Sequence, residues 1–311
     1  MSWIAVALSA YLLLAVANLL DKFLVDNVLK NSKAYAFAAC LLGAIIILAA
    51  PWFLSWPGWG LFFFNILNGF IFAIALWSLY EALRRGDAAR ILVFIGGVTP
   101  IFSLIFSLLF FKEHFTAAQY LGMLFILIGV AIIIFLPTKR SYLARIFNKF
   151  KLGQNIGSGG LGIALISALA YSVYFLSTKQ AYAYQPFISA FIWTRLGAAL
   201  FVLVFLIKRT DRQAIVSFWR QSSPNKSKLL VVLNQLLGAS GFILQNYAIF
   251  LGAVVLVNAL QGVQYAFLLI ISTLLALSAP HLLKENFSWK ILTQKTAAVV
   301  AVAIGLYFIA F

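Results

Sequence analysis

Residues 67–97 read LNGFIFAIALWSLYEALRRGDAARILVFIGG, and residues 233–263 read LNQLLGASGFILQNYAIFLGAVVLVNALQGV. The two stretches align without gaps, and six positions are identical: Leu67, Asn68, Ala73, Ala82, Gly86 and Gly96 meet Leu233, Asn234, Ala239, Ala248, Gly252 and Gly262. A second pair follows after a short insertion near SAPHLL, with KEHFT at 112–116 and KENFS at 284–288. The recurrence predicts a chain built from two related halves.

The composition around this repeat is that of a membrane protein. Apolar residues make up 64% of the 311 residues and charged residues only 10%, which is far from the average of soluble domains. A helix needs about 20 apolar residues to cross the hydrocarbon layer, and helices satisfy their own backbone groups there. Ten segments meet this length and are predicted to be transmembrane helices: 3–21, 34–50, 61–82, 90–110, 117–136, 160–180, 187–207, 228–249, 254–277 and 289–309.

Five predicted spans fall in each half, and an odd number forces the two halves into opposite orientations across the membrane. We therefore predict an all-α polytopic protein with two inverted five-helix repeats at 1–138 and 158–311, joined by a basic loop at 139–157. Inverted repeats are typical of secondary transporters, which hold substrate near the midplane between the halves. The first span lacks a charged n-region, so we expect it to remain in the protein rather than act as a signal peptide.

The formal net charge of +16 is distributed unevenly. Lys and Arg gather in the first, third, fifth, seventh and ninth connections, whereas the even-numbered connections hold only Lys112 and Lys179. This asymmetry matches the positive-inside rule and predicts a multi-pass protein of the cell (inner) membrane with both termini external. The positive charge then reflects topology and attraction to anionic membrane lipids, and we expect no nucleic-acid partner.

The KEHFT motif has a structural explanation. Thr116 is placed to cap the fifth predicted helix, with Gln119 at the capping-box position and Phe115 able to staple onto Tyr120. In the second copy, Ser288 takes the capping position. Glu113 and Glu285 could instead be gating or coupling acids, and that alternative stays open.

The spans and their order resemble the EamA family of the drug/metabolite transporter superfamily. The resemblance covers essentially the whole chain and rests on Gly86, Pro100, Glu113, Gly122 and Gly129. It implies a central cavity lined by eight of the spans, with the fifth and tenth spans peripheral. Family members usually keep both termini in the cytoplasm, so the charge pattern of this chain departs from the family habit.

Polar residues inside the spans are the candidates for a substrate site, because such groups are costly in lipid and face protein or water. Arg195 lies inside the seventh span and is a candidate anion contact or a structural tie. Spacing places Asn258, Gln261 and Tyr265 on one face of the ninth span. The full set of candidate cavity residues is Arg195, Asn258, Gln261, Tyr265, Tyr171, Tyr174, Asn68 and Asn234. Close helix packing is the alternative explanation for these amides, hydroxyls and neighbouring glycines.

Three charged residues near span ends are gate candidates, namely Lys22, Lys179 and Glu81. No carboxylate lies at the centre of a predicted span, so a buried acidic proton relay has little support. Cys40 is the only cysteine, and His114 and His281 lie in separate loops, so we expect no disulfide, metal or cofactor. No catalytic grouping is found, and an enzyme is not predicted.

The sequence thus predicts a secondary transporter that moves a small organic metabolite by alternating access around a central cavity. A lipid or lipid-carrier flippase and a non-transporting membrane scaffold are the alternatives. A flippase would need a lateral opening with a polar groove, and a scaffold would leave the polar faces packed together. Pairing with a second copy of the chain stays open.

Overall fold

The structure is a computed structural model, and it describes residues 2–27, 31–85, 88–134, 158–220, 225–278 and 289–310. Within these ranges every regular element is a helix. The first half contains α1 (Trp3–Asn27), α2 (Ser32–Gly43), η1 (Ala44–Ala49), α3 (Ala50–Phe53), α4 (Trp59–Arg85), α5 (Ala88–Phe106), the π-helical turn η2 (Ser107–Phe111) and α6 (Ala117–Ile134). The second half contains α8 (Ser158–Tyr184), α9 (Phe187–Leu203), η3 (Val204–Leu206), α10 (Arg209–Arg220), α11 (Asn225–Leu251), α12 (Val254–Ala259), α13 (Gln261–Ser278) and α14 (Trp289–Ala310).

The predicted all-helical fold is confirmed for the described residues. Seven of their helical segments are long and apolar enough to cross a membrane: 32–53, 59–85, 91–111, 160–184, 187–206, 229–251 and 293–310. Three shorter apolar helical segments, 3–18, 117–132 and 254–268, coincide with the remaining predicted spans. The predicted number of ten membrane spans stays a prediction.

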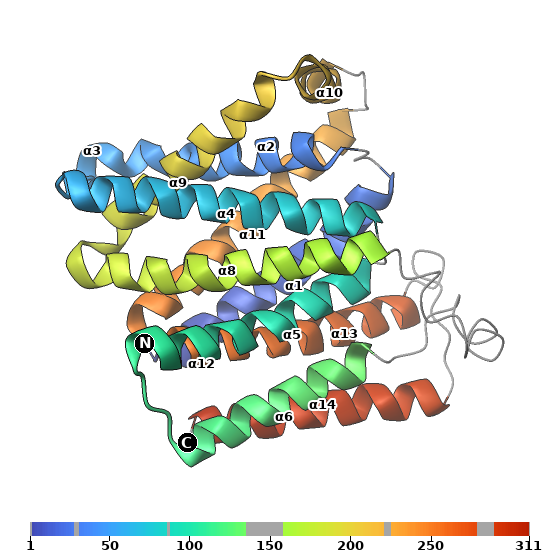
Figure 1. Cartoon of the computed structure of the whole chain (residues 1–311). Coiled ribbons are helices and arrows are strands. Elements are labelled where there is room, and N and C mark those ends of the chain that lie inside the picture. The colour runs from blue at the N-terminus through green and yellow to red at the C-terminus, as the bar shows by residue number, and fades with distance from the viewer. Residues whose placement is uncertain are drawn as a thin grey trace.

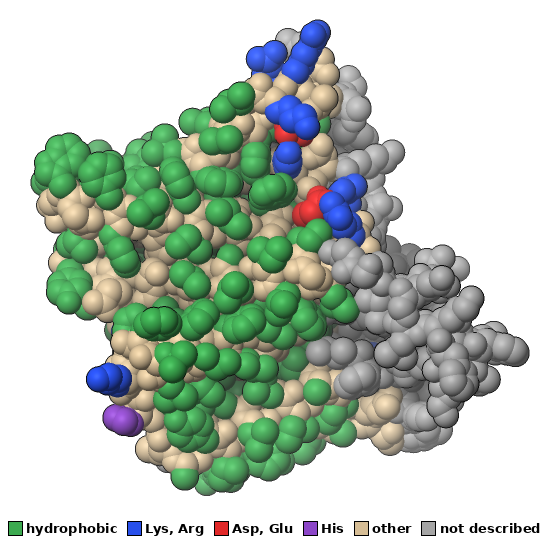
Figure 2. Space-filling view, in the orientation of Figure 1, with side chains coloured by type: hydrophobic (Ala, Val, Ile, Leu, Met, Phe, Trp, Pro, Cys, Tyr) green, Lys and Arg blue, Asp and Glu red, His purple; other side chains and the backbone are tan. Residues whose placement is uncertain are grey.

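Most of the long helices lie roughly parallel in one bundle, and Figure 1 shows the N and C ends at the same end of it. We call this the terminal end. The opposite end, the basic end, carries Lys33, Arg84 and Arg85 around one cavity, with Arg209 and Arg212 on the adjacent α10. Figure 2 shows most of the visible Lys and Arg side chains toward the basic end and the upper edge of this face, one further basic side chain beside a His at the terminal end, and hydrophobic side chains over much of the rest.

The terminal end carries a cluster of exposed aromatic rings. Trp56 contacts the rings of Trp59, Phe62 and Trp193 at centroid distances of 5.0, 5.3 and 5.8 Å. Trp56 and Trp59 are 54% and 68% exposed. Tryptophans with one apolar and one polar edge favour the membrane–water boundary. The cluster therefore suits an interface at the terminal end, and the charged residues suit one at the basic end.

The predicted capping box at the start of α6 is confirmed. The Thr116 amide donates to Gln119 Oε1 at 2.9 Å, and the Gln119 amide donates to Thr116 Oγ1 at 3.2 Å. The Phe115 and Tyr120 rings meet edge to face at 5.9 Å, which forms the expected staple. Glu113 accepts a hydrogen bond from Ser107 Oγ at 2.7 Å. The second copy, at 284–288, lies outside the described residues.

Replacing Thr116 with Ala should lower the stability of the folded protein by about 1 kcal/mol, because an N-cap side chain satisfies an otherwise unpaired helix amide. Thermal unfolding of the purified protein in detergent measures the change. Thr210→Ala, at an exposed threonine inside α10, is the matched control and should change the melting temperature little. An unchanged Thr116→Ala midpoint with reduced substrate binding would instead assign this motif to transport.

Glycines allow two pairs of helices to approach closely. A Cβ added to Gly122 of α6 would lie 2.7 Å from the Gly305 carbonyl oxygen of α14, and one added to Gly305 would lie 2.6 Å from the Gly122 carbonyl oxygen. Between α4 and α9, a Cβ on Gly69 would collide with the Thr194 backbone, and one on Gly197 would collide with the Ile66 backbone. Small residues of this kind mark tight helix packing in membranes.

Candidate functional site

A buried arginine surrounded by aromatic rings is the centre of the candidate site. Arg195 is the ninth of the 17 residues of α9 and is only 5% exposed. Its guanidinium carbon lies 4.0 Å from the ring centroid of Phe72 in α4, 4.6 Å from Phe191 in α9 and 4.5 Å from Phe242 in α11. The faces of these rings attract the cation, and three helices thereby hold the guanidinium in one place.

Arg195 makes few polar contacts for a buried cation. Its Nη2 donates to the Tyr174 hydroxyl at 3.5 Å, and its buried Nε has no hydrogen-bond partner among the described residues. Within the same residues, no carboxylate lies within ion-pair distance of Arg195. A buried charge without a counter-ion is costly, and such groups in structures call for an explanation. A ligand that supplies acceptor oxygens would satisfy this arginine.

The rings of Phe72, Phe191 and Phe242 form an aromatic cage around Arg195. Tyr174 links this cage to a second group of polar residues. The Tyr174 side chain of α8 is fully buried, and its hydroxyl donates to Asn246 Oδ1 of α11 at 3.1 Å. Tyr182 donates to the same oxygen at 3.3 Å. Tyr171, also in α8 and partly buried, stacks on Phe175 at 5.9 Å and lies 6.3 Å from the Phe72 ring. The structure thus brings the predicted residues Arg195, Tyr174 and Tyr171 together.

The candidates of the ninth predicted span contact α5. The helix is interrupted at Leu260, between α12 and α13. Asn258 donates to Ser103 Oγ at 2.9 Å, and Tyr265 donates to the Leu92 carbonyl oxygen at 2.5 Å. Oδ1 of Asn258 and Oε1 of Gln261 are buried without a partner among the described residues. These side chains hold the helices together and leave two acceptor oxygens unused.

The two asparagines related by the repeat are both buried. Asn68 of α4 donates to Thr178 Oγ1 of α8 at 2.7 Å, which ties these two helices together. Asn234 lies in the interior face of α11 at 2% exposure. Each is therefore positioned between helices, as both the packing and the substrate-contact hypotheses require.

The structure gives Lys179 a specific contact. Its ammonium donates to three carbonyl oxygens at the end of α11, those of Ile249, Phe250 and Gly252, at 2.9, 3.0 and 2.9 Å. A cation at a helix C-terminus pairs with carbonyls that lack an intrahelical partner and with the helix dipole. Lys179 is thus a cap that joins α8 to α11. Lys22 lies within α1, and its side chain is outside the described residues.

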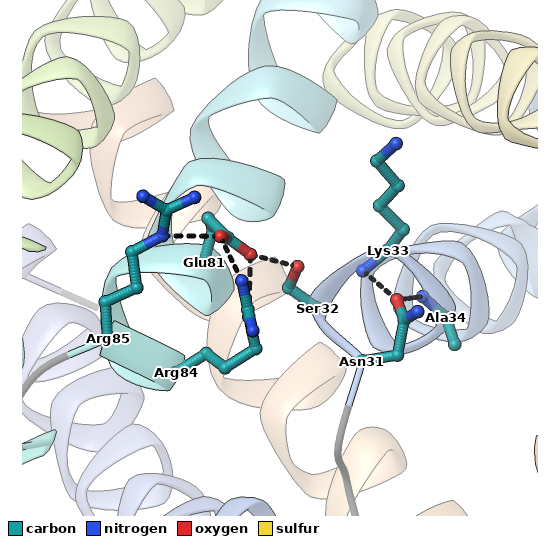
Figure 3. Close-up of polar contacts among 7 residues, drawn as sticks. All are labelled: Asn31, Ser32, Lys33, Ala34, Glu81, Arg84 and Arg85. Carbon is teal, nitrogen blue, oxygen red and sulfur yellow. Dashed lines mark hydrogen bonds and ion pairs between the residues drawn. The ribbon is translucent and has the colours of Figure 1, made fainter. Parts of the chain in front are cut away.

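Glu81 is part of a charged cluster at the basic end (Figure 3). It accepts from Ser32 Oγ at 2.5 Å, from Arg84 at 2.7 and 3.1 Å, and from Arg85 Nε at 2.6 Å. Lys33 forms an ion pair with Asp211 of α10 at 2.6 Å. These residues line a cavity of about 570 Å³ between α2, α4, α8 and α10, together with Asn31, Ile74, Trp77, Ser78, Ile163 and Ile166.

Sequence reasoning missed the residues that complete the cage. Phe72, Phe191 and Phe242 look like ordinary lipid-facing or core residues, because nothing in an apolar span marks a ring that faces a cation. Asn246 had a signal, since it is an amide inside the predicted span at 228–249.

The described residues form an all-helical bundle with seven helices of membrane length and polar groups between them, which defines the class of multi-pass membrane proteins. Residues 1–135 match the sequence profile of the EamA-like transporter family. The predicted resemblance to the EamA family is therefore confirmed over residues 1–135, which lie in the first half of the chain.

Two further comparisons concern a related sequence and the fold. "Uncharacterized transporter YdfC" of Bacillus subtilis (strain 168) is 30% identical over 141 residues, which is 44% of this chain and 40% of that protein. The matched region thus spans less than half of the relative. A protein of known crystal structure shares the fold with a TM-score of 0.65 at 16% identity, covering 97% of this chain and 94% of the other.

Proposed function

We propose that the chain is a secondary transporter of a small organic solute, amphipathic or anionic, which binds beside Arg195 between two inverted five-helix repeats. The observation that carries this proposal is the buried guanidinium without a carboxylate partner among the described residues. Its ring contacts come from α4 of the first half and from α9 and α11 of the second. A substrate carboxylate or phosphate there would contact both halves.

The helix contacts support the inverted repeat. The third helix of each half packs along the first helix of the other, as α4 packs on α8 and α11 on α1. The fourth helices follow the same rule, because α5 packs on α8 and α13 on α1. The fifth helices, α6 and α14, pack against each other. Such exchange is what a two-fold axis in the membrane plane produces, and we propose ten spans on this basis.

The flippase alternative has one observation in its favour, because the cavity at the basic end borders the outer surface of α8 through Ile166, which is 54% exposed. However, α4 and α8 are joined beyond this point. Ser167 Oγ donates to the Ala75 carbonyl oxygen at 2.8 Å, and Asn68 contacts Thr178. A headgroup would need a continuous polar groove, so a solute carrier is the better proposal. An enzymatic activity is no part of it.

Transport by the purified protein in vesicles, supplied with a pooled metabolite extract, tests the proposal. Gln261→Ala and Tyr174→Phe should weaken uptake of the identified solute several-fold, because lost hydrogen bonds cost roughly 0.5 to 1.5 kcal/mol each. Tyr120→Phe, at an exposed tyrosine on α6, is the matched control and should transport normally. Equal uptake by wild type and both site variants would place the substrate elsewhere, and no uptake of any solute would support a scaffold.

The proposed orientation puts the basic end in the cytoplasm of a cell whose inner membrane the chain crosses. Reporter fusions after Phe150 and Ser222 should then report cytoplasm, and fusions after Ser55 and at Phe311 should report the external side. A periplasm-only reporter active at residue 150 would reverse the assignment and agree with the usual family orientation.

A further inference from the structure

The cavity at the basic end carries more positive than negative charge. Lys33, Arg84 and Arg85 line it against Glu81 and Asp211. The side chains of Arg84 and Arg85 are each 48% exposed, whereas that of Glu81 is 14% exposed. In Figure 3 the two terminal nitrogens of Arg85 take part in none of the contacts drawn, because only its Nε reaches Glu81. Both carboxylates are thus paired with basic side chains of the cluster, and the terminal nitrogens of Arg85 remain as donors at its surface.

A buried donor belongs to a residue that lines the same cavity. The indole Nε1 of Trp77 is buried and has no hydrogen-bond partner among the described residues. Trp77 lines the cavity, and the Lys33 ammonium lies 5.6 Å from its ring centroid. Buried indole N–H groups usually find an acceptor. An oxygen atom of a bound molecule would supply this acceptor, next to the Lys33 ammonium and the guanidinium groups of the cluster.

The remaining wall of the cavity is apolar and continues onto the outer surface of the bundle. Ile74, Ile163 and Ile166 form this wall, and Ile166 is 54% exposed. Figure 2 shows the acidic and basic groups of the basic end directly bordered by hydrophobic side chains of the same face. A molecule in the cavity therefore meets donors on one side and a hydrocarbon-facing surface on the other.

The helix beside the cavity is amphipathic and lies across the bundle. Figure 1 shows α10 nearly end-on, while the long helices run across the view. Ile215 of α10 is buried in the core, and Arg209 and Arg212 are exposed. Helices of this type lie in the membrane interface and favour anionic lipids. The Lys33–Asp211 ion pair fixes α10 to the start of α2 at this level.

We propose that the cavity binds the headgroup of an anionic phospholipid. The phosphate accepts from Arg85 and from the Trp77 indole, and the acyl chains lie against Ile163 and Ile166. The closed contact between α4 and α8 at Ser167 keeps the headgroup at the interface, so this lipid is bound and not transported. The site is separate from the one beside Arg195, and the proposal does not depend on what is transported.

Native mass spectrometry of the detergent-purified full chain, titrated with phosphatidylglycerol or phosphatidylcholine, tests this site without an activity assay. Wild type should retain one phosphatidylglycerol with at least roughly fivefold preference over phosphatidylcholine. Arg85→Gln should weaken phosphatidylglycerol binding roughly three- to tenfold, a modest range because the arginine is half-exposed. Trp77→Phe keeps the ring and should weaken binding about threefold by removing the donor.

Arg209→Gln is the matched control, because Arg209 is exposed on α10 and is not among the lining residues of the cavity. It should change the affinity less than about twofold. An equal effect of Arg209→Gln and Arg85→Gln would reduce the site to general attraction at a basic surface and overturn the proposal. Equal binding of phosphatidylglycerol and phosphatidylcholine would also overturn the proposal. Competition by glycerol phosphate at the same concentration as the lipid would identify a site for soluble anions instead.

Discussion

Replacing Arg195 with Met should strongly weaken transport of an anionic solute and leave the folded protein at least as stable as the wild type. Methionine is flexible and apolar, so it can fill the space between the rings of Phe72, Phe191 and Phe242. Replacing buried charges with apolar side chains is often neutral or stabilising. Hydrogen bonds to a charged group contribute about 1.5 to 3 kcal/mol, so substrate affinity should fall roughly ten- to 150-fold.

Replacing Arg195 with Lys distinguishes the contribution of the charge from that of the planar guanidinium. Lysine keeps the charge but loses the planar guanidinium that lies against three rings, so an intermediate affinity is expected. Thermal unfolding and substrate binding, measured on the same samples, separate the two roles of the arginine. Arg212→Gln, on the exposed face of α10, should alter neither. If Arg195→Met unfolds or expresses poorly while residual protein binds all solutes equally, the arginine is a structural tie and the proposed site is wrong.

The sequence was a good guide to helices and their ends. The helix that begins after Thr116 could be predicted, because a capping box is local and depends on residues three positions apart. Membrane segments are similarly local, since each must satisfy its own backbone within an apolar stretch. Within the described residues, helical segments cover every predicted span, although the ninth is interrupted at Leu260. Periodicity does not reveal details such as the short π-helical turn before Lys112.

The candidate site was harder to predict, because it depends on contacts between distant parts of the chain. Arg195, Tyr174 and Tyr171 were recognised as polar residues within spans, but the rings around Arg195 come from three helices. Lys179 was a gate candidate, and the carbonyls that it caps lie some 70 residues away in sequence. Conventional spacing rules relate residues within one helix and give no information on such pairs.

The two halves differ in how closely their helices approach, and one residue of the repeat accounts for part of the difference. The second helix of the second half, α9, packs along α4 much more extensively than α2 packs along α11. Gly69 allows the close contact on α4, whereas the aligned residue in LNQL on α11 is Gln235. A glutamine side chain holds a neighbouring helix further away. The α4–α9 contact is therefore close, and its counterpart between α2 and α11 is looser.

Gly69→Ala and Gly197→Ala should each destabilise the protein strongly and reduce transport. The added methyl group would meet the backbone of Thr194 or of Ile66, and a backbone cannot move aside as a flexible side chain can. Overpacking of this kind costs about 1 to 3 kcal/mol, and here it would force α4 and α9 apart. The thermal unfolding midpoint measures the loss, and cysteine labelling along the α4–α9 contact measures the separation, after Cys40 has been replaced.

Gly162→Ala provides the control for both variants. Gly162 lies inside α8, and an added Cβ there would meet nothing within 4 Å. Alanine is favoured over glycine in a helix by up to about 1 kcal/mol, so this variant should be as stable as the wild type or more stable. If glycine-to-alanine replacement lowers stability at positions 69 and 197 but not at position 162, contact between α4 and α9, and not helix propensity, determines the change in stability. If Gly69→Ala and Gly197→Ala melt like Gly162→Ala and transport normally, α4 and α9 do not need to touch for the protein to fold or work.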